Sequence, residues 1–376
     1  MPNQIASPGP SPLAARRSRA CRAACHPAGG VSETGCARAA GRAFGRRFRL
    51  GVFRVHEPRR TQTILGLLGA DFALAQGAGG NTSFKHGDLL TIKASGFRLG
   101  DAGERDIFVD VPVAAARAMA DGGPAHADAG GRRASIETSL HAVLPQRAVA
   151  HLHMIPLLAL AVRADAAEVL AARLAGLDWA LVPYLKPGVA VAQAVRALVA
   201  ARGAPGVVVL ANHGIVFAGD GFEQVAALVD EVRARVDVAP RAVPAADPAG
   251  LAALAGRHAL EPARVAAAHG AALDPAATGF ATAGSLYPDH VVFLGRGAAL
   301  LGAGEAESLL FLAPGKGALL APGLSDEAHE MAACLAEVAL RIDPGAPLSL
   351  LGREAEDELI HWDAELYRRA LADEAG

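Results

Sequence analysis

The chain has 376 residues, of which 52% are hydrophobic and 20% are charged, and its formal net charge is -2. This length allows one large domain or two smaller ones, each with a sizeable core. The near-zero net charge argues against a nucleic-acid partner, which would need a concentrated cationic face. No apolar run reaches the ~18 residues that span a bilayer, so we expect no membrane partner.

Residues 1–55 differ in composition from the rest, because they are rich in Ala, Arg, Gly and Pro and Glu33 is their only acid. Such a composition is also typical of a transit peptide, but we interpret the segment as a disordered extension or as the product of a start codon placed too far upstream. It holds three of the four cysteines, whose spacing indicates neither a disulfide framework nor a redox pair. A reducing, cytoplasmic location is therefore expected.

From Thr61 on, the expected elements alternate between helix and strand. Apolar residues at helical spacing predict a helix over residues 64–74, before a glycine-rich run. Further apolar patterns predict an α/β layered domain up to about residue 240, with strands 89–92, 107–111, 148–153, 179–184 and 207–211, and helices 135–144, 157–174, 189–201 and 222–238.

Prolines at positions 240, 244 and 248 predict a linker over residues 240–250. Beyond it, the patterns predict a smaller α/β segment over residues 250–376. Its expected elements are two short helices, strands near 291–294 and 309–312, and amphipathic helices near 326–342 and 354–371.

Histidines follow two of the predicted strands. In His151-Leu152-His153, side chains i and i+2 project from one face of a strand, roughly 6.5 Å apart, and two imidazoles at that spacing can bind one ion. His213 lies in Asn212-His213-Gly214, directly after the strand 207–211. A lone histidine is more often a packed core or surface residue, but three with an open fourth position are typical of a catalytic zinc.

Glu137 lies just upstream of these histidines, near the start of the predicted helix 135–144. A carboxylate there is ordinarily only favourable with the helix dipole. If it faces the metal, it could take a proton from the carbon beside a carbonyl group, or return one. His141, four residues later on the same helix face, either supports the site or packs the helix.

The run Gly77-Ala78-Gly79-Gly80-Asn81-Thr82-Ser83 is expected to be a loop between the first helix and the first strand. Clustered glycines let backbone N–H groups approach an anion closely. The spacing matches neither the dinucleotide fingerprint nor the Walker-A motif. Lys93-Ala94-Ser95-Gly96 could add a hydroxyl and an N–H to the same anion site, or form only a turn.

In their order along the chain, these motifs resemble the class II aldolase/adducin family over roughly residues 60–235. The matching motifs are Gly80-Asn81-Thr82-Ser83, Lys93-Ala94-Ser95-Gly96, Ser135-Ile136-Glu137, His151-Leu152-His153 and Asn212-His213-Gly214. The short interval from Glu137 to His151 and the segment 285–317, with Tyr287-Pro288-Asp289-His290, are most similar to the aldolase half of the long bifunctional rhamnulose-1-phosphate aldolase/dehydrogenases.

The resemblance implies a three-layer αβα domain with a central mixed sheet over residues 56–240. It implies Zn²⁺ or another divalent metal on His151, His153 and His213, with Glu137 as the acid/base group. It also implies a homo-oligomer, a tetramer, and a substrate phosphate near Gly80, Asn81, Ser95, Gly96 and Ser135. The sequence departs from the family at Ile136, where many members have a second serine that would add a hydroxyl to the phosphate site.

The resulting hypothesis is a zinc-dependent aldolase, a lyase of carbohydrate metabolism that cleaves a phosphorylated ketose by retro-aldol chemistry through a metal-stabilised enediolate. The chain has only four lysines, which argues against a Schiff base. The alternatives are a sugar-phosphate 4-epimerase, a decarboxylase or dehydratase, and a non-catalytic, adducin-like scaffold, which is expected to lack the metal ligands. No nicotinamide cofactor is expected, because the Rossmann glycine fingerprint is missing.

Overall fold

The computed structural model describes residues 66–303 and 307–363. The chain separates into two units, residues 1–54 and 55–376, and all described residues belong to the second. The predicted extension over residues 1–55 lies outside the described residues. Of the helix predicted over 64–74, the described part contains only the 3₁₀ turn η2 (Leu67–Ala70). Asp71 follows it, and its side chain accepts a hydrogen bond from the Ala73 N–H, a local turn that competes with helix.

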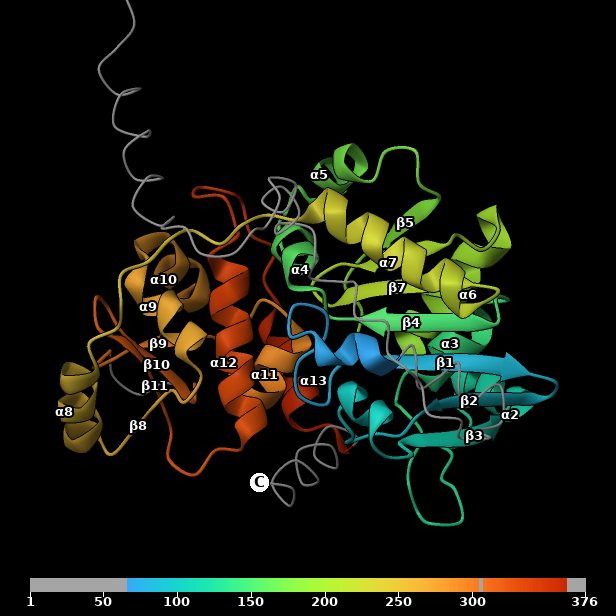
Figure 1. The fold of residues 1–376 in the computed structure, drawn as a ribbon, viewed down its shortest axis with the longest axis horizontal. Coiled ribbons are helices and arrows are strands. Elements are labelled where there is room, and N and C mark those ends of the chain that lie inside the picture. The colour runs from blue at the N-terminus through green and yellow to red at the C-terminus, as the bar shows by residue number, and fades with distance from the viewer. Residues whose placement is uncertain (1–65, 304–306, 364–376) are drawn as a thin grey trace, which may run out of the picture. The chain divides into compact units, whose positions relative to one another are not determined.

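A seven-stranded sheet forms the centre of the first part of the chain (Figure 1), in the order β3-β2-β1-β4-β7-β6-β5. Neighbouring strands are antiparallel except β5 and β6, which are parallel. The predicted mixed sheet is therefore confirmed. Its strands are β1 (Asn81–His86), β2 (Leu89–Lys93), β3 (Phe108–Pro112), β4 (Ala148–Leu152), β5 (Trp179–Val182), β6 (Val207–Leu210) and β7 (Gly214–Gly219).

Two of these strands were not predicted. β1 begins inside the run that we expected to be a loop. We expected a loop because the first three residues of β1 are polar and show no apolar alternation. It nevertheless lies between β2 and β4, with Asn81 in register with His151. β7 forms a tight antiparallel hairpin with β6, and the turn holds Asn212 with a φ of 54°, a left-handed conformation that asparagine tolerates.

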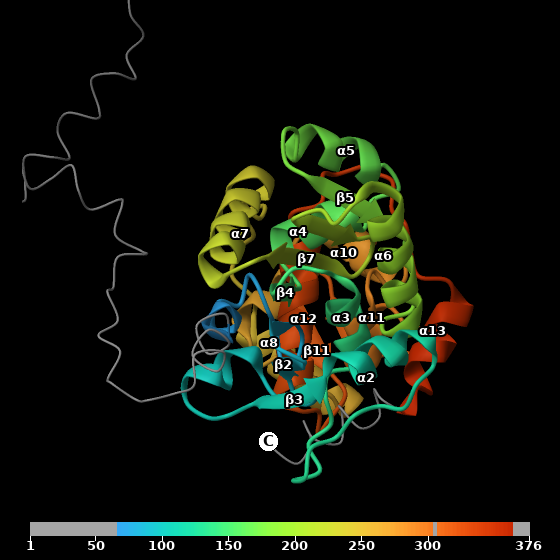
Figure 2. The ribbon, with the colours of Figure 1, turned by 90° about the vertical axis from the view of Figure 1, so that its right-hand side faces the viewer.

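Helices cover both faces of this sheet (Figure 2), which confirms the three-layer αβα arrangement. On one face, α4, α5 and α7 pack against β4, β6 and β7. On the other face, α3 and α6 pack against the same strands, and α2 covers β2 and β3. The helical elements are α2 (Val113–Ala118), α3 (Thr138–Val143), α4 (Ile155–Ala161), α5 (Ala166–Arg173), α6 (Val189–Arg202), α7 (Phe222–Val236), and the 3₁₀ turns η3 (Leu99–Gly103) and η4 (Met119–Asp121).

The C-terminal part contains the predicted smaller α/β segment, built on a four-stranded sheet with the order β8-β11-β10-β9. Its strands are β8 (Glu261–Pro262), β9 (Ala299–Leu300), β10 (Leu310–Ala313) and β11 (Gly317–Leu320). Its helical elements are α8 (Pro248–His258), η5 (Ala266–His269), α9 (Gly270–Leu273), α10 (Pro275–Thr282), α11 (Pro288–Leu294), α12 (Asp326–Ala339) and α13 (Arg353–Ile360).

The strand predicted near residues 291–294 is wrong, since these residues form the end of helix α11. Every residue of α11 is buried, so no polar face produces the 3.6-residue period that marks a helix. Pro288, at the first turn, has the φ that a helix start requires.

Helix α12 runs between the two sheets in Figure 1. Its apolar residues share one core with α4, α9, α11 and the strands β10 and β11. Because α4 also packs on the seven-stranded sheet, it links the two cores. Among the described residues, no helix is long and apolar enough to cross a membrane.

Candidate functional site

Strand β4 directs two histidines to the sheet face that α3 covers. Ala148, Ala150 and Leu152 pack in the core on the α4 and α7 side, and Val149 packs on the α3 side. Since side chains alternate along a strand, His151 faces α3. His153, one residue past the strand, stays beside it, and the two ring centroids are 4.9 Å apart.

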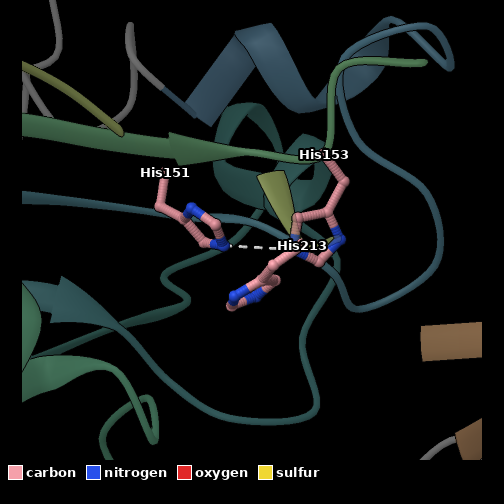
Figure 3. A group of neighbouring side chains, drawn as sticks. All are labelled: His151, His153 and His213. Carbon is pink, nitrogen blue, oxygen red and sulfur yellow. Dashed lines mark hydrogen bonds between the residues drawn. The ribbon is translucent and has the colours of Figure 1, made fainter. Parts of the chain in front are cut away.

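His213 reaches the same place from the β6–β7 turn. Its ring centroid lies 4.8 Å from that of His151 and 5.4 Å from that of His153. Figure 3 shows the three rings gathered around one point. One nitrogen from each ring lies within 4.8 Å of the others, and all three residues are buried. The structure therefore brings together the three predicted ligands.

A hydrogen bond behind the His151 ring and an ion-pair contact behind the His153 ring show which nitrogens face one another. Nδ1 of His151 lies 3.1 Å from the Ile215 carbonyl oxygen, and Nδ1 of His153 lies 2.9 Å from Asp289 Oδ2. Both partners are acceptors, which favours a proton on each Nδ1 and leaves each Nε2 available to bind a cation.

The two Nε2 atoms are 3.0 Å apart. At this distance they share a hydrogen bond when one of them carries a proton, and they can both bind one cation when neither does. Burial lowers the pKa of His151, and it lowers the pKa of His213 to about 3, so these imidazoles are neutral, the form that binds metal. The residues present therefore fit a divalent cation.

Glu137 lies directly beside this group, as the residue preceding α3. Its Oε2 is 3.3 Å from His151 Nε2, and its Oε1 is 3.5 Å from His213 Nε2. Burial favours the neutral carboxyl, but positive charge at His151 and His213, carried by a proton or a bound cation, and a 2.8 Å hydrogen bond from Asn81 Nδ2 outweigh it and lower the pKa of Glu137. The carboxylate is thus ionised at neutral pH.

A pocket opens next to Glu137 and is lined by all of the predicted phosphate residues: Gly80, Asn81, Ser95, Gly96 and Ser135. Lys93, Ile136 and Asp289 also line it. Asn81 uses its amide inside the site, because Nδ2 donates to Glu137 and, at 3.2 Å, to Ser135 Oγ. His141 is not among the three clustered histidines; its Nδ1 lies 2.7 Å from Ser83 Oγ.

Asp289, which we expected only as part of the motif Tyr287-Pro288-Asp289-His290 and not in the site, reaches His153 from α11 in the C-terminal part. Gly214 was likewise expected only as part of the motif around His213. A Cβ atom at position 214 would lie 2.6 Å from the Leu152 carbonyl oxygen and 3.0 Å from His151 Cε1. Glycine is therefore required for β7 to pass the two histidines. The signal for Gly214 was its place directly after His213.

Residues 65–238 match the family model of the class II aldolase and adducin N-terminal domain. None of the curated proteins matches the chain. Three solved structures are similar to about half of this chain. A class II aldolase domain from Thermoplasma acidophilum is 23% identical over 50% of this chain and 96% of that chain, with a TM-score of 0.43. YgbL from Klebsiella pneumoniae, described provisionally as an aldolase, epimerase or decarboxylase, is 25% identical over 48% of this chain and 86% of its own (TM-score 0.36), and an L-fuculose-1-phosphate aldolase from Thermus thermophilus is 17% identical over 48% of this chain and 92% of its own (TM-score 0.33).

Proposed function

Residues 65–238 belong to the class II aldolase/adducin family, and from this premise we propose that the protein is a zinc-dependent aldolase acting on a phosphorylated ketose. The observation that carries the proposal is a group of three buried imidazoles with one nitrogen from each within 4.8 Å of the others, and Glu137 beside them. A non-catalytic, adducin-like scaffold would not require three buried imidazoles that meet at one point.

His151, His153 and His213 would hold the cation. When bound, a divalent ion supplies Lewis-acid polarisation of the ketose carbonyl and adjacent hydroxyl, a contribution of several kcal/mol. In cleavage, the bond between C3 and C4 breaks, the C4 hydroxyl loses its proton as the aldehyde forms, and C3 gains a proton. Glu137 would deliver the proton to C3, and in the reverse direction would remove it.

Asn81 would orient Glu137, since its hydrogen bond at 2.8 Å goes to Oε2 of the carboxylate. Lys93, Ser95, Gly96 and Ser135, which line the same pocket, would receive the substrate phosphate. Lys93 Nζ donates to the Ala78 and Phe97 carbonyl oxygens, which holds its positive charge in place. The apolar Ile136 leaves the pocket with one hydroxyl fewer than a serine would provide.

A homo-tetrameric assembly and a cytoplasmic location remain proposals that rest on the family assignment. Sedimentation equilibrium of the full chain would test the first, and imaging of the tagged protein in its host would test the second.

The proposed reaction is tested with a substrate screen on the zinc-loaded full chain, in which ketose 1-phosphates are compared with the same unphosphorylated ketoses. We expect release of triose phosphate from at least one ketose 1-phosphate and none from the matched variant His153→Ala. Metal content is measured on both proteins in parallel.

Other products would redirect the proposal. Inversion at C4 without net cleavage would indicate an epimerase, and release of carbon dioxide or water would indicate a decarboxylase or dehydratase. A wild-type protein that binds no divalent metal, or a His153→Ala variant that binds as much, would refute the metal site.

A further inference from the structure

We propose that Asp289, which lies outside the matched family domain, is a positioning residue for the metal site. Its carboxylate would hold the His153 ring in the tautomer and orientation that direct Nε2 toward His151 and His213. The inference depends on the proposed metal site. It goes beyond that site by giving the C-terminal segment a defined part in building it.

Asp289 is placed for this role by helix α11. It is 5% exposed, and its Oδ2 lies 2.9 Å from His153 Nδ1. The opposite nitrogen of the same ring, Nε2, faces His151. The helix dipole alone would also favour a carboxylate in the first turn of α11. The dipole alone, however, would not require this side chain to be buried and directed at an imidazole.

The three histidines differ in what lies behind their rings. Nδ1 of His151 faces the neutral carbonyl of Ile215. Nδ1 of His213 has no hydrogen-bond partner in the described part of the chain. His153 alone of the three has a carboxylate at Nδ1. A ligand histidine that donates its second N–H to a carboxylate is held in one orientation and is a more basic ligand.

The glycine-rich run covers this contact. A Cβ atom at Gly79 would lie 2.9 Å from His153 Nδ1 and 3.0 Å from Asp289 Oδ2. Only glycine lets the backbone pass this close to the pair. The run therefore contributes to the metal side of the site as well as to the rim of the pocket.

The test measures the zinc dissociation constant of the full chain by chelator competition, for wild type, Asp289→Asn and Asp289→Ala. Loss of such a carboxylate typically weakens metal binding by 10–100-fold. We expect about 10-fold for Asp289→Asn, which keeps the shape and an acceptor but not the charge, and a larger loss for Asp289→Ala.

The matched control is Asp274→Asn, which alters another carboxylate of the C-terminal part. Asp274 caps α10 and pairs with Arg241, and it has no part in the proposed site. This variant should lower the melting temperature and leave zinc affinity unchanged. As a second readout, nitrogen NMR shifts of His153 in the zinc-loaded protein should report a protonated Nδ1 in wild type and a changed Nδ1 environment in Asp289→Asn.

The outcomes separate the two proposals. If wild type binds zinc and both Asp289 variants bind it equally well, the positioning role is refuted and the metal site stands. If wild type binds no zinc, the proposed function itself fails. If Asp289→Asn changes the coordination number seen in the absorption spectrum of the cobalt-substituted protein, Asp289 is a ligand, and the positioning role is again refuted. Asp289→Asn decides the question if Asp289→Ala does not fold.

Discussion

In the seven-stranded sheet, strand β1 buries Asn81, Thr82 and Ser83, whereas β10 and β11 of the four-stranded sheet bury only glycine, alanine and leucine. Burying a polar group costs free energy unless it gains a partner. In β1 the cost is offset where Asn81 meets Glu137 and Ser83 meets His141. The seven-stranded sheet therefore carries polar site residues in addition to its cores, whereas β10 and β11 contribute only to a core.

Substitutions should therefore separate into two classes. Changes at the ends of β1, β4 and β6 should alter chemistry or metal binding more than stability. Changes in the core that α12 shares with β10 and β11 should alter stability alone. Asp289 and Asn212 are the informative exceptions, because both connect the two parts.

The largest effect should come from Glu137→Gln, which keeps the shape of the side chain but cannot carry a proton to or from carbon. Removing an acid/base group of this kind lowers kcat by about 10²–10⁴-fold. We expect that loss with zinc content unchanged, measured with the substrate that the screen identifies. Glu356→Gln, at another buried carboxylate, is the control and should retain activity. Less than a tenfold loss in Glu137→Gln would exclude the acid/base role.

The second-largest effect should come from the core that α12 shares with β10 and β11. Leu335 is fully buried in α12, and Leu→Ala at such a site typically lowers the free energy of unfolding by about 2–5 kcal/mol. We expect that loss for Leu335→Ala in urea titrations, with the zinc dissociation constant unchanged. The control Leu300→Ala, at a side chain of a residue 41% exposed, should cost far less. A parallel loss of zinc affinity in Leu335→Ala would contradict the division between site and core.

The same contrast explains which parts could be predicted from the sequence. Strands such as β6 and helices such as α7 carry strong apolar periodicity, so their place was predicted within a few residues. β1 was not predicted because its first residues are polar, as the site requires. α11 was mistaken for a strand because a helix buried on all sides has no polar face.

For the site itself, the spacing of His151 and His153 carries the information, because two residues apart means one face of a strand. His213 could be added because it follows a predicted strand. The contact between Asp289 and His153 could not be predicted, because it depends on how α11 packs in the core of the C-terminal part. No local pattern encodes a packing contact of that kind.

A smaller effect should follow from breaking the polar link at Asn212. Its Nδ2 donates to the carbonyl oxygens of Leu286 and Ser349, at 2.9 and 2.6 Å. Leaving buried acceptors without a donor costs about 1–3 kcal/mol, so Asn212→Gly, which tolerates the left-handed φ, should lose that much stability. Asn212→Ala should lose about 1 kcal/mol more from the backbone. Equal losses in the two variants would show that the φ is not strained in alanine.

Acid stability should distinguish a buried histidine of the C-terminal part from the three candidate ligands. Burial lowers the pKa of His290 to about 4, more than its contact with Gly297 raises it. Because this pKa is below the unfolded value of about 6.5, the unfolded chain binds the extra proton first. The stability contributed by neutral His290 is therefore complete above about pH 6.5 and is lost as the pH falls toward 4.

At pH 5 this linkage amounts to a loss of about 2 kcal/mol relative to pH 7. Zinc should protect the three candidate ligands from protonation, but it cannot protect His290. In the zinc-loaded protein, the free energy of unfolding should therefore fall less steeply between pH 7 and pH 5 for His290→Gln than for wild type. His361→Gln, at an exposed residue, should follow the wild-type curve. If His290→Gln also follows the wild-type curve, the acid sensitivity arises from the candidate metal site and not from the core of the C-terminal part.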